Sequence, residues 1–377
     1  MSLGRSSLLV LKIGVTTTAL ILIIQTVPWR DQVVLTDDRT GTLIKGNANT
    51  VDVRIHNSAA TESLPASSVR NVEPGFRSIV GRIRPEWVLA WLACTAISAG
   101  LLVSRWHYVL GQVSEKPPPA SWCGVIWARS QVINLLPLSQ IGGDAYRMQR
   151  AVRPLGGAAS SAGVIALERL IGLIALLSVM MIGWAASGRA RWPFGVMIVV
   201  GCAGAWITVA ALAGRIRNRP RPAAAPQRLR RGGLTAFVLP LAHLVRNPCA
   251  FAFVLAMSVT AHLLTAASFL TVDRALGLNT PVWAYWVAIP LVSLAQFLPI
   301  HIAGIGVLEG GLYAVLSTWT SRSWVEVASV STTARIALLL WTALLSLAFI
   351  VDPVRTNKGI SCSDVRSSGS PGPGVCT

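Results

Sequence analysis

The side chains best suited to chemistry in this sequence are ionisable residues that interrupt apolar segments. An ionisable group inside a bilayer costs several kcal/mol, so each is a candidate for a functional role. The set is Arg129, Asp144, Arg147, Glu168, Arg169 and Glu309. Two interpretations carry equal weight. Arg147 or Arg169 could hold a lipid phosphate, with the acids as charge partners or gates. Alternatively, Arg147 reaches the interface and Glu168 pairs with a nearby arginine to hold helices together.

Asp144 and Arg147 follow residues that disfavour a continuous helix. A helix beginning at Gly143 would place Asp144 and Arg147 on one face, because they are three residues apart. Its free backbone N–H groups would attract phosphate, although Asp144 would repel a phosphate unless it is paired. The expected hinges of this segment are Pro137, Gly142 and Gly143, and its polar residues include Arg129 and Asn134.

Glu309 lies in a second interrupted segment, whose expected hinges are Pro299, Gly304 and Gly306. No residue near Glu309 in the sequence neutralises its charge, so a cation, a proton or a headgroup amine are all candidate partners. Gly306 and Gly310 also form a small-xxx-small pair, and close helix packing alone would explain these glycines.

Other chemistry is not supported by the sequence. The five histidines show no repeated spacing, so no metal site is expected. There is no Walker-type phosphate loop and no nucleophile elbow. The six cysteines form no framework, and four of them lie in apolar segments. We therefore expect no cofactor and lean against an enzyme.

The composition identifies an integral membrane protein. The chain has 377 residues, of which 53% are hydrophobic and 13% are charged, and its mean hydropathy is +0.58. Soluble domains carry about 25% charged residues. The net charge of +18 comes from basic residues spread between apolar segments. We interpret them as topology determinants and contacts to anionic lipid, and we expect no nucleic-acid partner.

The apolar segments predict an all-α polytopic fold with about seven or eight transmembrane helices and two broken segments, since one crossing needs about 20 apolar residues. The expected continuous spans are Leu8–Val27, Trp87–Leu110, Ala158–Ala186, Phe194–Ala213, Cys249–Leu270 and Ala334–Val351. The first span reads as an uncleaved anchor, residues 1–27, with a cytoplasmic N-terminus. The basic loop, residues 215–248, holds eight arginines between Arg215 and Arg246 and belongs in the cytoplasm.

Two regions differ from the membrane segments. Residues 28–86 are polar and include alternating stretches such as 51–55, which predicts a small β-rich extracytoplasmic insert, with a turn at residues 36–41. The membrane region would then cover residues 87–352. The Ser, Gly and Pro content of residues 353–377 predicts a disordered tail.

The two broken segments are expected to open on opposite sides of the membrane. One covers Trp122–Leu138 and the following glycines, and the other runs from Val282 to Leu316. Non-helical backbone at membrane depth is tolerated where it is buried in protein or lines a cavity. One such segment in each half is the pattern of inverted-repeat transporters, although sequence identity between the halves is not evident.

These motifs resemble a known family. The stretch Asn134-Leu-Leu-Pro137, Gly142-Gly143-Asp144 and Arg147, followed by Glu168-Arg169-Leu170, resembles the transmembrane domain of lysylphosphatidylglycerol synthases, the flippase-like family. So do Pro299-Ile-His-Ile-Ala-Gly-Ile-Gly306 with Glu309 and Gly310, and Arg105-Trp106 at the end of a span. The resemblance covers roughly residues 87–351.

The resemblance implies a bacterial inner-membrane protein with two inverted sets of helices and re-entrant segments. By position, Asp144, Arg147, Glu168, Arg169 and Glu309 would line a lipid pathway. Only 26 residues follow Val351, so lysyl transfer by this chain is not expected. Members of the family are linked to aminoacylated phospholipids, hopanoids, glycolipids or polyprenyl-linked sugars, which leaves the cargo open.

The leading hypothesis is therefore a lipid translocase whose partner is a membrane lipid with an anionic headgroup, supplied by a separate lipid-synthesising enzyme. A second hypothesis is a polyprenyl-phosphate-dependent glycosyltransferase, because Asp31, Asp37 and Asp38 follow the first span and one could act as a general base. Turn-forming aspartates would explain the same residues. A third hypothesis is a membrane scaffold for envelope lipid biosynthesis that acts through the insert.

Overall fold

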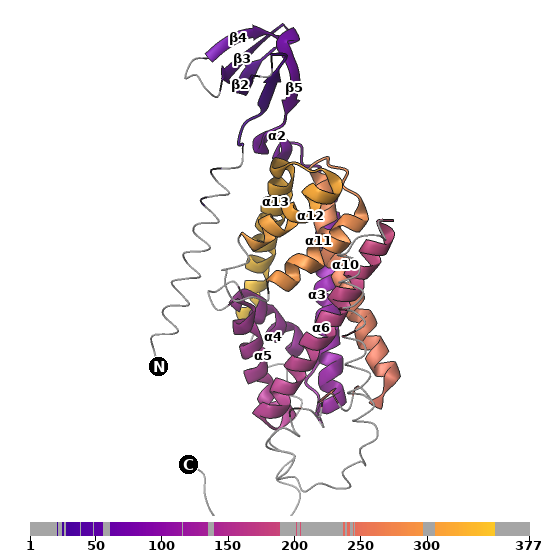
Figure 1. The fold of residues 1–377 in the computed structure, drawn as a ribbon. Coiled ribbons are helices and arrows are strands. Elements are labelled where there is room, and N and C mark those ends of the chain that lie inside the picture. Colours follow the sequence, from indigo (N-terminus) through magenta and orange to yellow (C-terminus); the bar gives the residue numbers. More distant parts are fainter. Residues whose placement is uncertain are drawn as a thin grey trace, which may run out of the picture.

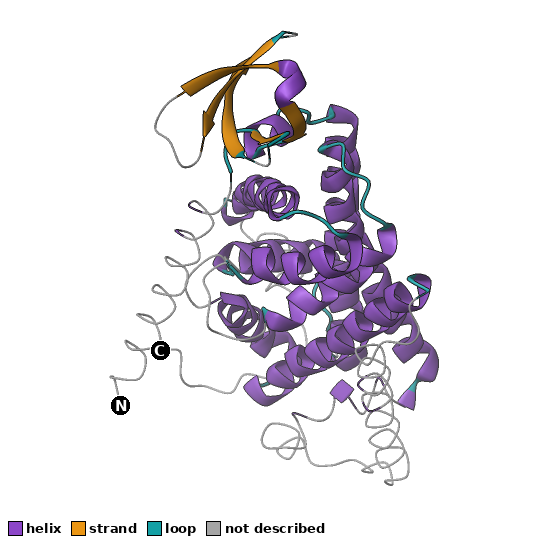
Figure 2. Cartoon of the chain, turned by 45° about the horizontal axis from the view of Figure 1, so that its top comes forward, coloured by secondary structure: helices purple, strands orange, loops and turns teal. Residues whose placement is uncertain are grey.

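The protein is mostly helical, with a small sheet near its N-terminus (Figures 1 and 2). The computed structural model describes residues 28–37, 39–47, 49–55, 61–114, 116–134, 139–188, 246–296 and 306–350, together with a few isolated positions. Almost all of the expected first span, the expected span 194–213, the basic loop and the tail lie outside the described residues. The expected hinges Pro137, Pro299 and Gly304 do as well.

Within this described part, four helices are long and apolar enough to cross a bilayer. They are α3 (Pro85–Val113), α6 (Ala158–Ala186), α10 (Pro248–Ala275) and α13 (Trp324–Ser346). These four helices are fewer than the seven or eight transmembrane helices that the sequence predicts for the whole chain. Proline begins α3 and α10, where its missing N–H costs nothing.

Helix α13 begins ten residues earlier than the apolar run predicts and ends before Val351. The Ser323 hydroxyl accepts from the Glu326 N–H, while the Glu326 carboxylate accepts from the Ser323 N–H. This reciprocal capping box satisfies two backbone donors and starts the helix at Trp324. The capping residues are polar, so hydropathy alone places the start of α13 too late.

Each predicted broken segment forms a pair of shorter helices. The first pair is α4 (Ala120–Ile133) and α5 (Ser139–Leu155), and the second is α11 (Val282–Ala295) and α12 (Val307–Thr320). Helices α4, α11 and α12 have 14 residues each, which is about 21 Å of helix and less than the hydrocarbon thickness. A pair therefore enters the helical layer and returns.

The two pairs open at opposite ends of the molecule (Figure 1). Helices α3 and α10 pack antiparallel, since the Arg84 N–H donates to the Ala275 carbonyl at one end of α3. At the other end of α3, the Ser114 hydroxyl donates to the Pro154 carbonyl, 2.7 Å away, at the end of α5. The α4–α5 pair thus opens beside the C-terminal end of α3, and the α11–α12 pair opens beside its N-terminal end.

The two pairs also match position by position. Proline is the N-cap of both α4 and α11, and an amide residue, Asn134 or Gln296, is the C-cap of each. In the returning helices, the fifth residue is a glycine that faces the eleventh residue of the preceding helix. A Cβ on Gly143 would lie 2.5 Å from the Ser130 carbonyl oxygen, and a Cβ on Gly311 would lie 2.7 Å from Cγ2 of Val292.

The expected hinges fall into two groups. Gly142 and Gly143 lie inside α5, which begins at Ser139, so they do not form the break that the sequence predicts. Gly143 is needed instead for close packing, because its N–H donates to the Asn134 side chain and leaves no space for a Cβ. Gly306 is the N-cap of α12 with φ of 84°, a backbone conformation that favours glycine.

Five antiparallel strands form the predicted small sheet. They are β1 (Gln32–Leu35), β2 (Thr40–Gly46), β3 (Thr50–Ile55), β4 (Thr61–Pro65) and β5 (Val69–Glu73), in the order β4-β3-β2-β1-β5. The turn expected at residues 36–41 joins β1 to β2. Alternation along β1 and β3 buries four side chains, which form a core of their own: Val33, Leu35, Val53 and Ile55.

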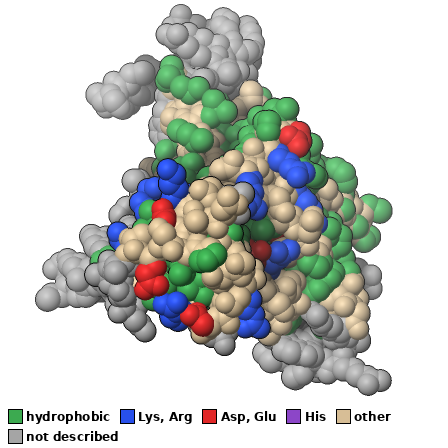
Figure 3. Space-filling view, turned by 90° about the horizontal axis from the view of Figure 1, so that it is seen from above, with side chains coloured by type: hydrophobic (Ala, Val, Ile, Leu, Met, Phe, Trp, Pro, Cys, Tyr) green, Lys and Arg blue, Asp and Glu red, His purple; other side chains and the backbone are tan. Residues whose placement is uncertain are grey.

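A short helix connects the sheet to the membrane helices. Helix α2 (Phe76–Val80) follows β5, and its Ile79 is buried in the same hydrophobic core as α11 and α12. A 3-10 turn, η1 (Ala66–Ser68), joins β4 to β5, and another, η2 (Leu347–Phe349), follows α13. On the face seen from above in Figure 3, basic and acidic side chains are interspersed, so the net charge is not gathered there.

Candidate functional site

A cavity of about 490 Å³ lies where the long helices and the tips of both helix pairs meet. Eight helices contribute to its wall, namely α3 to α6 and α10 to α13. Five of the residues singled out in the sequence line it: Asn134, Asp144, Arg147, Glu168 and Arg169. These residues come from three elements, so only the packing of the helices brings them together.

The centre of the charged wall is Glu168 on α6, whose side chain is almost fully buried. Its carboxylate accepts hydrogen bonds from Arg147 and, at 3.4 Å, from Arg105 on α3. Buried carboxylates in proteins are paired, because an unpaired ion would lose its hydration without compensation. Glu168 therefore holds α3, α5 and α6 together, as the structural interpretation of the sequence expects. The other part of that interpretation is wrong, because Arg147 is buried in this pair and does not reach the interface.

Asp144 completes the cluster at its more exposed side. The Asp144 carboxylate accepts from Nε and Nη2 of Arg169, at 2.6 Å and 2.5 Å. It also lies 3.7 Å from Nη1 of Arg147, the neighbour one helical turn away. Asp144 is thus paired, so the repulsion of a phosphate expected from an isolated carboxylate is reduced.

Arg105 is a member of the cluster that sequence reasoning did not place there. It read as the cytoplasmic end of a span, but only 8% of the residue is exposed and its Nη1 donates to the Ser258 hydroxyl at 2.9 Å. The sequence does hold a signal for this residue. Arg105 lies eight residues before the end of the apolar helix α3, which places it inside the membrane segment and not among the residues that flank it.

The charged wall has an excess of positive charge and of hydrogen-bond donors. Three arginines, Arg105, Arg147 and Arg169, face two acids, Asp144 and Glu168. The Nε atoms of Arg105 and Arg147 are buried and have no hydrogen-bond partner among the residues that the structure describes. The Arg147 guanidinium also lies 4.6 Å from the centre of the buried Trp106 ring, which holds it in place. This arrangement suits an anion with several oxygens.

Glu309 is neutralised by a residue far away in the sequence. Its carboxylate accepts from Nη2 of Arg335 on α13 at 2.8 Å and from the Gly306 N–H at 2.7 Å. Arg335 lines the cavity, whereas Glu309 is 3% exposed and does not. The carboxylate caps α12 and joins it to α13, which explains this residue without a bound cation or amine.

Arg129 lies outside the cavity. Its Nε donates to the Ala348 carbonyl at 3.0 Å, and its Nη1 lies 3.5 Å from the Tyr146 hydroxyl. These contacts join α4 to α5 and to the end of α13. Arg129 therefore stabilises the first helix pair and does not reach the cavity.

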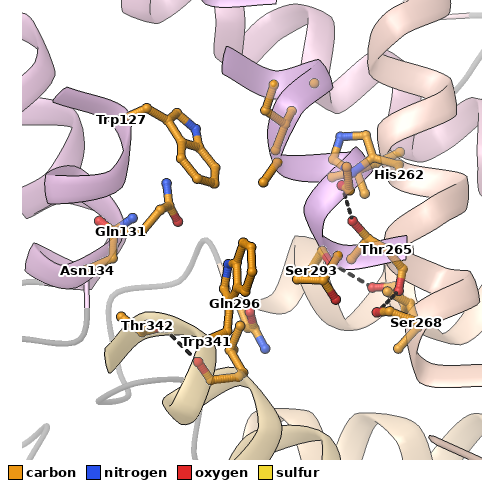
Figure 4. Close-up of a pocket in the computed structure, with 18 of the residues that line it drawn as sticks. Trp127, Gln131, Asn134, His262, Thr265, Ser268, Ser293, Gln296, Trp341 and Thr342 are labelled. Carbon is orange, nitrogen blue, oxygen red and sulfur yellow. Dashed lines mark hydrogen bonds between the residues drawn. The ribbon is translucent and has the colours of Figure 1, made fainter. Parts of the chain in front are cut away.

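A second set of neutral side chains lines the cavity (Figure 4), and sequence reasoning missed all of its labelled members except Asn134. Neutral polar residues and tryptophans are common in any membrane helix, so their types alone gave no signal. The labelled members are Trp127, Gln131, Asn134, His262, Thr265, Ser268, Ser293, Gln296, Trp341 and Thr342. Among the described residues, no group of three or more His, Cys, Asp or Glu side chains could hold a metal ion.

The comparison with known families fits this arrangement. The family model of the lysylphosphatidylglycerol synthase TM region matches residues 70–349, about three quarters of the chain. The chain belongs to this family. No curated protein and no solved structure shows significant similarity to it. It is a multi-pass membrane protein, and all residues that line the cavity lie within the part matched by the lysylphosphatidylglycerol synthase TM family.

The first four strands precede the region matched by the lysylphosphatidylglycerol synthase TM family, and so do the three aspartates of the second hypothesis, which lie just before β1 and between β1 and β2. Asp31 accepts from the Gly75 N–H at 2.7 Å, which ties the start of β1 to the start of α2. Asp37 accepts from the Arg39 side chain at 2.6 Å in the β1–β2 turn. This bond holds the pKa of Asp37 below its ordinary value, which weakens it as a base. Asp38 lies outside the described residues.

Proposed function

We propose that this protein moves a lipid with an anionic headgroup between the two leaflets of a bacterial plasma membrane. The observation that carries the proposal is the cavity between two helix pairs that enter from opposite ends, with an excess of arginine on one wall. A phosphate is the anion that a membrane lipid most often carries, and arginine binds it through several hydrogen bonds at once.

The architecture supports a transport role more than a catalytic one. Residues 85–186 and 248–346 have the same order of helices: one long helix, a proline-capped helix of 14 residues, a returning helix and a second long helix. Because α3 and α10 are antiparallel, the two halves would be inverted repeats. Inverted repeats with broken helices at the midplane are typical of alternating-access transporters.

The paired arginines suggest how the site binds and releases its ligand. A phosphate oxygen would replace one of the carboxylates at Arg147 or Arg169, and Asp144 would take its place again when the lipid leaves. This exchange would avoid exposing an unpaired arginine inside the membrane. Arg335 and Glu309 on the other helix pair would form a second point where α12 and α13 separate.

The orientation follows from the distribution of arginine. With the basic loop, residues 215–248, in the cytoplasm, the N-terminus would be cytoplasmic and the sheet extracytoplasmic. A separate enzyme would then make the lipid that enters from the cytoplasmic side. The sheet would remain available as a contact surface for that or another envelope protein.

The test is reconstitution of the purified protein into liposomes that contain a lipid extract from the source organism. A membrane-impermeant label would report which lipid class changes leaflet. We expect Arg147→Ala to reduce the initial rate by roughly ten- to a hundredfold, because it removes a charged hydrogen-bond donor to the phosphate, and such bonds contribute roughly 1.5–3 kcal/mol. Arg150→Ala is the matched control, since Arg150 is exposed on the same helix and contacts the Tyr146 ring.

Wild-type rates in folded Arg147→Ala protein would exclude the arginine cluster as the lipid site. No movement of any lipid class by the wild-type protein would exclude the translocase and favour the scaffold or the glycosyltransferase. Substitution of Asp31 and Asp37 by alanine would then be compared with deletion of residues 30–84.

A further inference from the structure

We infer that the headgroup carried by this protein is a phosphodiester bearing an uncharged polyhydroxylated ring, such as a sugar or a cyclitol. The inference rests on the proposed function and adds the chemical class of the cargo. It follows from the neutral side chains that line the cavity and from the partners of the acids that line it.

The neutral side chains offer hydrogen-bonding groups from four directions (Figure 4). Gln131 comes from α4, His262 from α10, Ser293 from α11 and Thr342 from α13. Hydroxyl groups of a ring donate and accept at once, and the Gln131 amide and the His262 imidazole can match them in both roles. The Ser293 and Thr342 hydroxyls already donate to carbonyls of their own helices, so they offer acceptors. An acyl chain would leave the Gln131 and His262 side chains without a partner.

One of these groups lacks a partner although it is buried. The Nε2 atom of His262 is shielded from solvent and makes no hydrogen bond within the described residues. No hydrogen bond of the Gln131 side chain is found in this part of the chain, although the residue lines the same cavity. Buried polar atoms without a partner are rare in folded proteins, and a ligand atom is a common reason for one.

Two indoles provide flat apolar surfaces beside these polar groups. Trp127 on α4 and Trp341 on α13 both reach into the cavity, and in Figure 4 they approach its middle from different sides. A pyranose or cyclitol ring has C–H faces that pack on an indole and hydroxyls at its edge that bond to polar side chains. Large aromatic surface with a few placed polar groups is the composition of a specific small-molecule site.

The acids argue against an amine-bearing headgroup. A lysyl headgroup carries two ammonium groups, each of which needs a carboxylate. The exchange proposed above would free Asp144 from Arg169, but Glu168 would stay bound by Arg105 and Arg147. Glu309 is bound to Arg335 and does not line the cavity. A lysyl headgroup would add positive charge to a wall that already has an excess of it. The cargo therefore differs from the lipid in the family's name.

The test compares binding of three lipids to the purified full-length protein in detergent. The probes carry the same fluorescent acyl chain and are phosphatidylinositol, phosphatidylglycerol and lysylphosphatidylglycerol. They are an anionic phosphodiester with a ring, one without a ring, and one with an amine. We expect the Kd of phosphatidylinositol to be at least about tenfold lower than that of either other probe, as two or three neutral hydrogen bonds would give.

Two variants test the neutral side chains of the cavity. Trp341→Leu and Gln131→Leu should each raise the Kd of phosphatidylinositol by roughly three- to tenfold and leave that of phosphatidylglycerol within about twofold. Trp319→Leu is the matched control, because Trp319 contacts Trp283 and does not line the cavity. Equal or tighter binding of lysylphosphatidylglycerol would overturn the inference, as would unchanged phosphatidylinositol binding by both variants.

The same probes in liposomes separate this inference from the proposed function. If the expected binding pattern is found but no probe changes leaflet, the ring-binding site stands and the translocase does not. If phosphatidylglycerol changes leaflet while phosphatidylinositol is neither bound preferentially nor moved, the translocase stands and the inference is wrong.

Discussion

The buried carboxylate of Glu168 forms ion pairs with two arginines. Arg105 and Arg147 come from helices that are far apart in the sequence, and neither has another described acid as close. The cluster is therefore a structural joint as well as the proposed headgroup site. A substitution at this residue acts on folding as well as on binding.

At the residue scale, we predict that Glu168→Gln destabilises the protein by about 3–5 kcal/mol, because it leaves buried guanidinium groups without a counter-charge. Thermal unfolding in detergent would measure the loss. Glu62→Gln is the control, since Glu62 pairs with Arg39 on the surface of the sheet and such pairs contribute about 0–1 kcal/mol.

A double variant tests whether Arg105 and Glu168 stabilise the protein together. Adding Arg105→Met to Glu168→Gln removes one uncompensated charge, so the double variant should be more stable than Glu168→Gln alone. If the double variant were less stable by the sum of the two single losses, Arg105 and Glu168 would act independently and the cluster would not be a joint.

The helix pairs are held together at the element scale by glycines that permit close approach. Gly143 lies against the Ser130 carbonyl and the Asn134 side chain, and Gly311 lies against Val292. A methyl group at either position would separate two helices that must form one compact unit. Small residues at helix contacts are the usual means of close packing in membranes, where water provides no driving force.

We predict that Gly143→Ala lowers stability by roughly 1–3 kcal/mol, because the new Cβ overlaps backbone that cannot move independently. Gly310→Ala is the matched control on the other helix pair, since a Cβ there meets nothing within 4 Å. The control should be neutral or stabilise α12 by up to about 1 kcal/mol. The measurement is the unfolding transition of each variant in detergent. Equal stability of Gly143→Ala and Gly310→Ala would contradict the packing argument.

At the scale of the whole molecule, the arginines of the basic loop predict the orientation in the membrane. The loop precedes α10, and Cys249 at the start of α10 is exposed. The sheet lies at the opposite end of the long helices (Figure 1). If the loop is cytoplasmic, these two positions face different compartments.

We predict that a membrane-impermeant maleimide labels Cys249 only after the cytoplasmic side is opened, in a variant where the other cysteines are replaced by serine. Replacing Cys249 as well and introducing Thr61→Cys on the exposed β4 strand should give a site that is labelled in intact cells. The reverse pattern would invert the orientation, and with it the side from which the lipid enters each helix pair.

The sequence alone determined the membrane environment, the broken segments and the family. Low charge and long apolar runs exclude a water-soluble fold, since unpaired charges are expensive in lipid. The interrupted apolar runs predicted the two broken segments that form α4–α5 and α11–α12, although Gly142 and Gly143 lie inside α5. These features depend on neighbouring residues, which the sequence shows directly. Four residues of the charged cluster, Asp144, Arg147, Glu168 and Arg169, were found because ionisable groups are rare in such runs, whereas Arg105 was not.

Only the tertiary structure decided the partners. Glu309 looked unpaired because Arg335 is 26 residues away, and Gly143 looked like a hinge because its contact with Asn134 requires a folded helix pair. Most of the neutral side chains of the cavity were not found, since these helices are apolar on most sides and their periodicity does not show which face meets a cavity. Contacts between separate helices depend on their rotation and depth, which packing sets and local sequence does not.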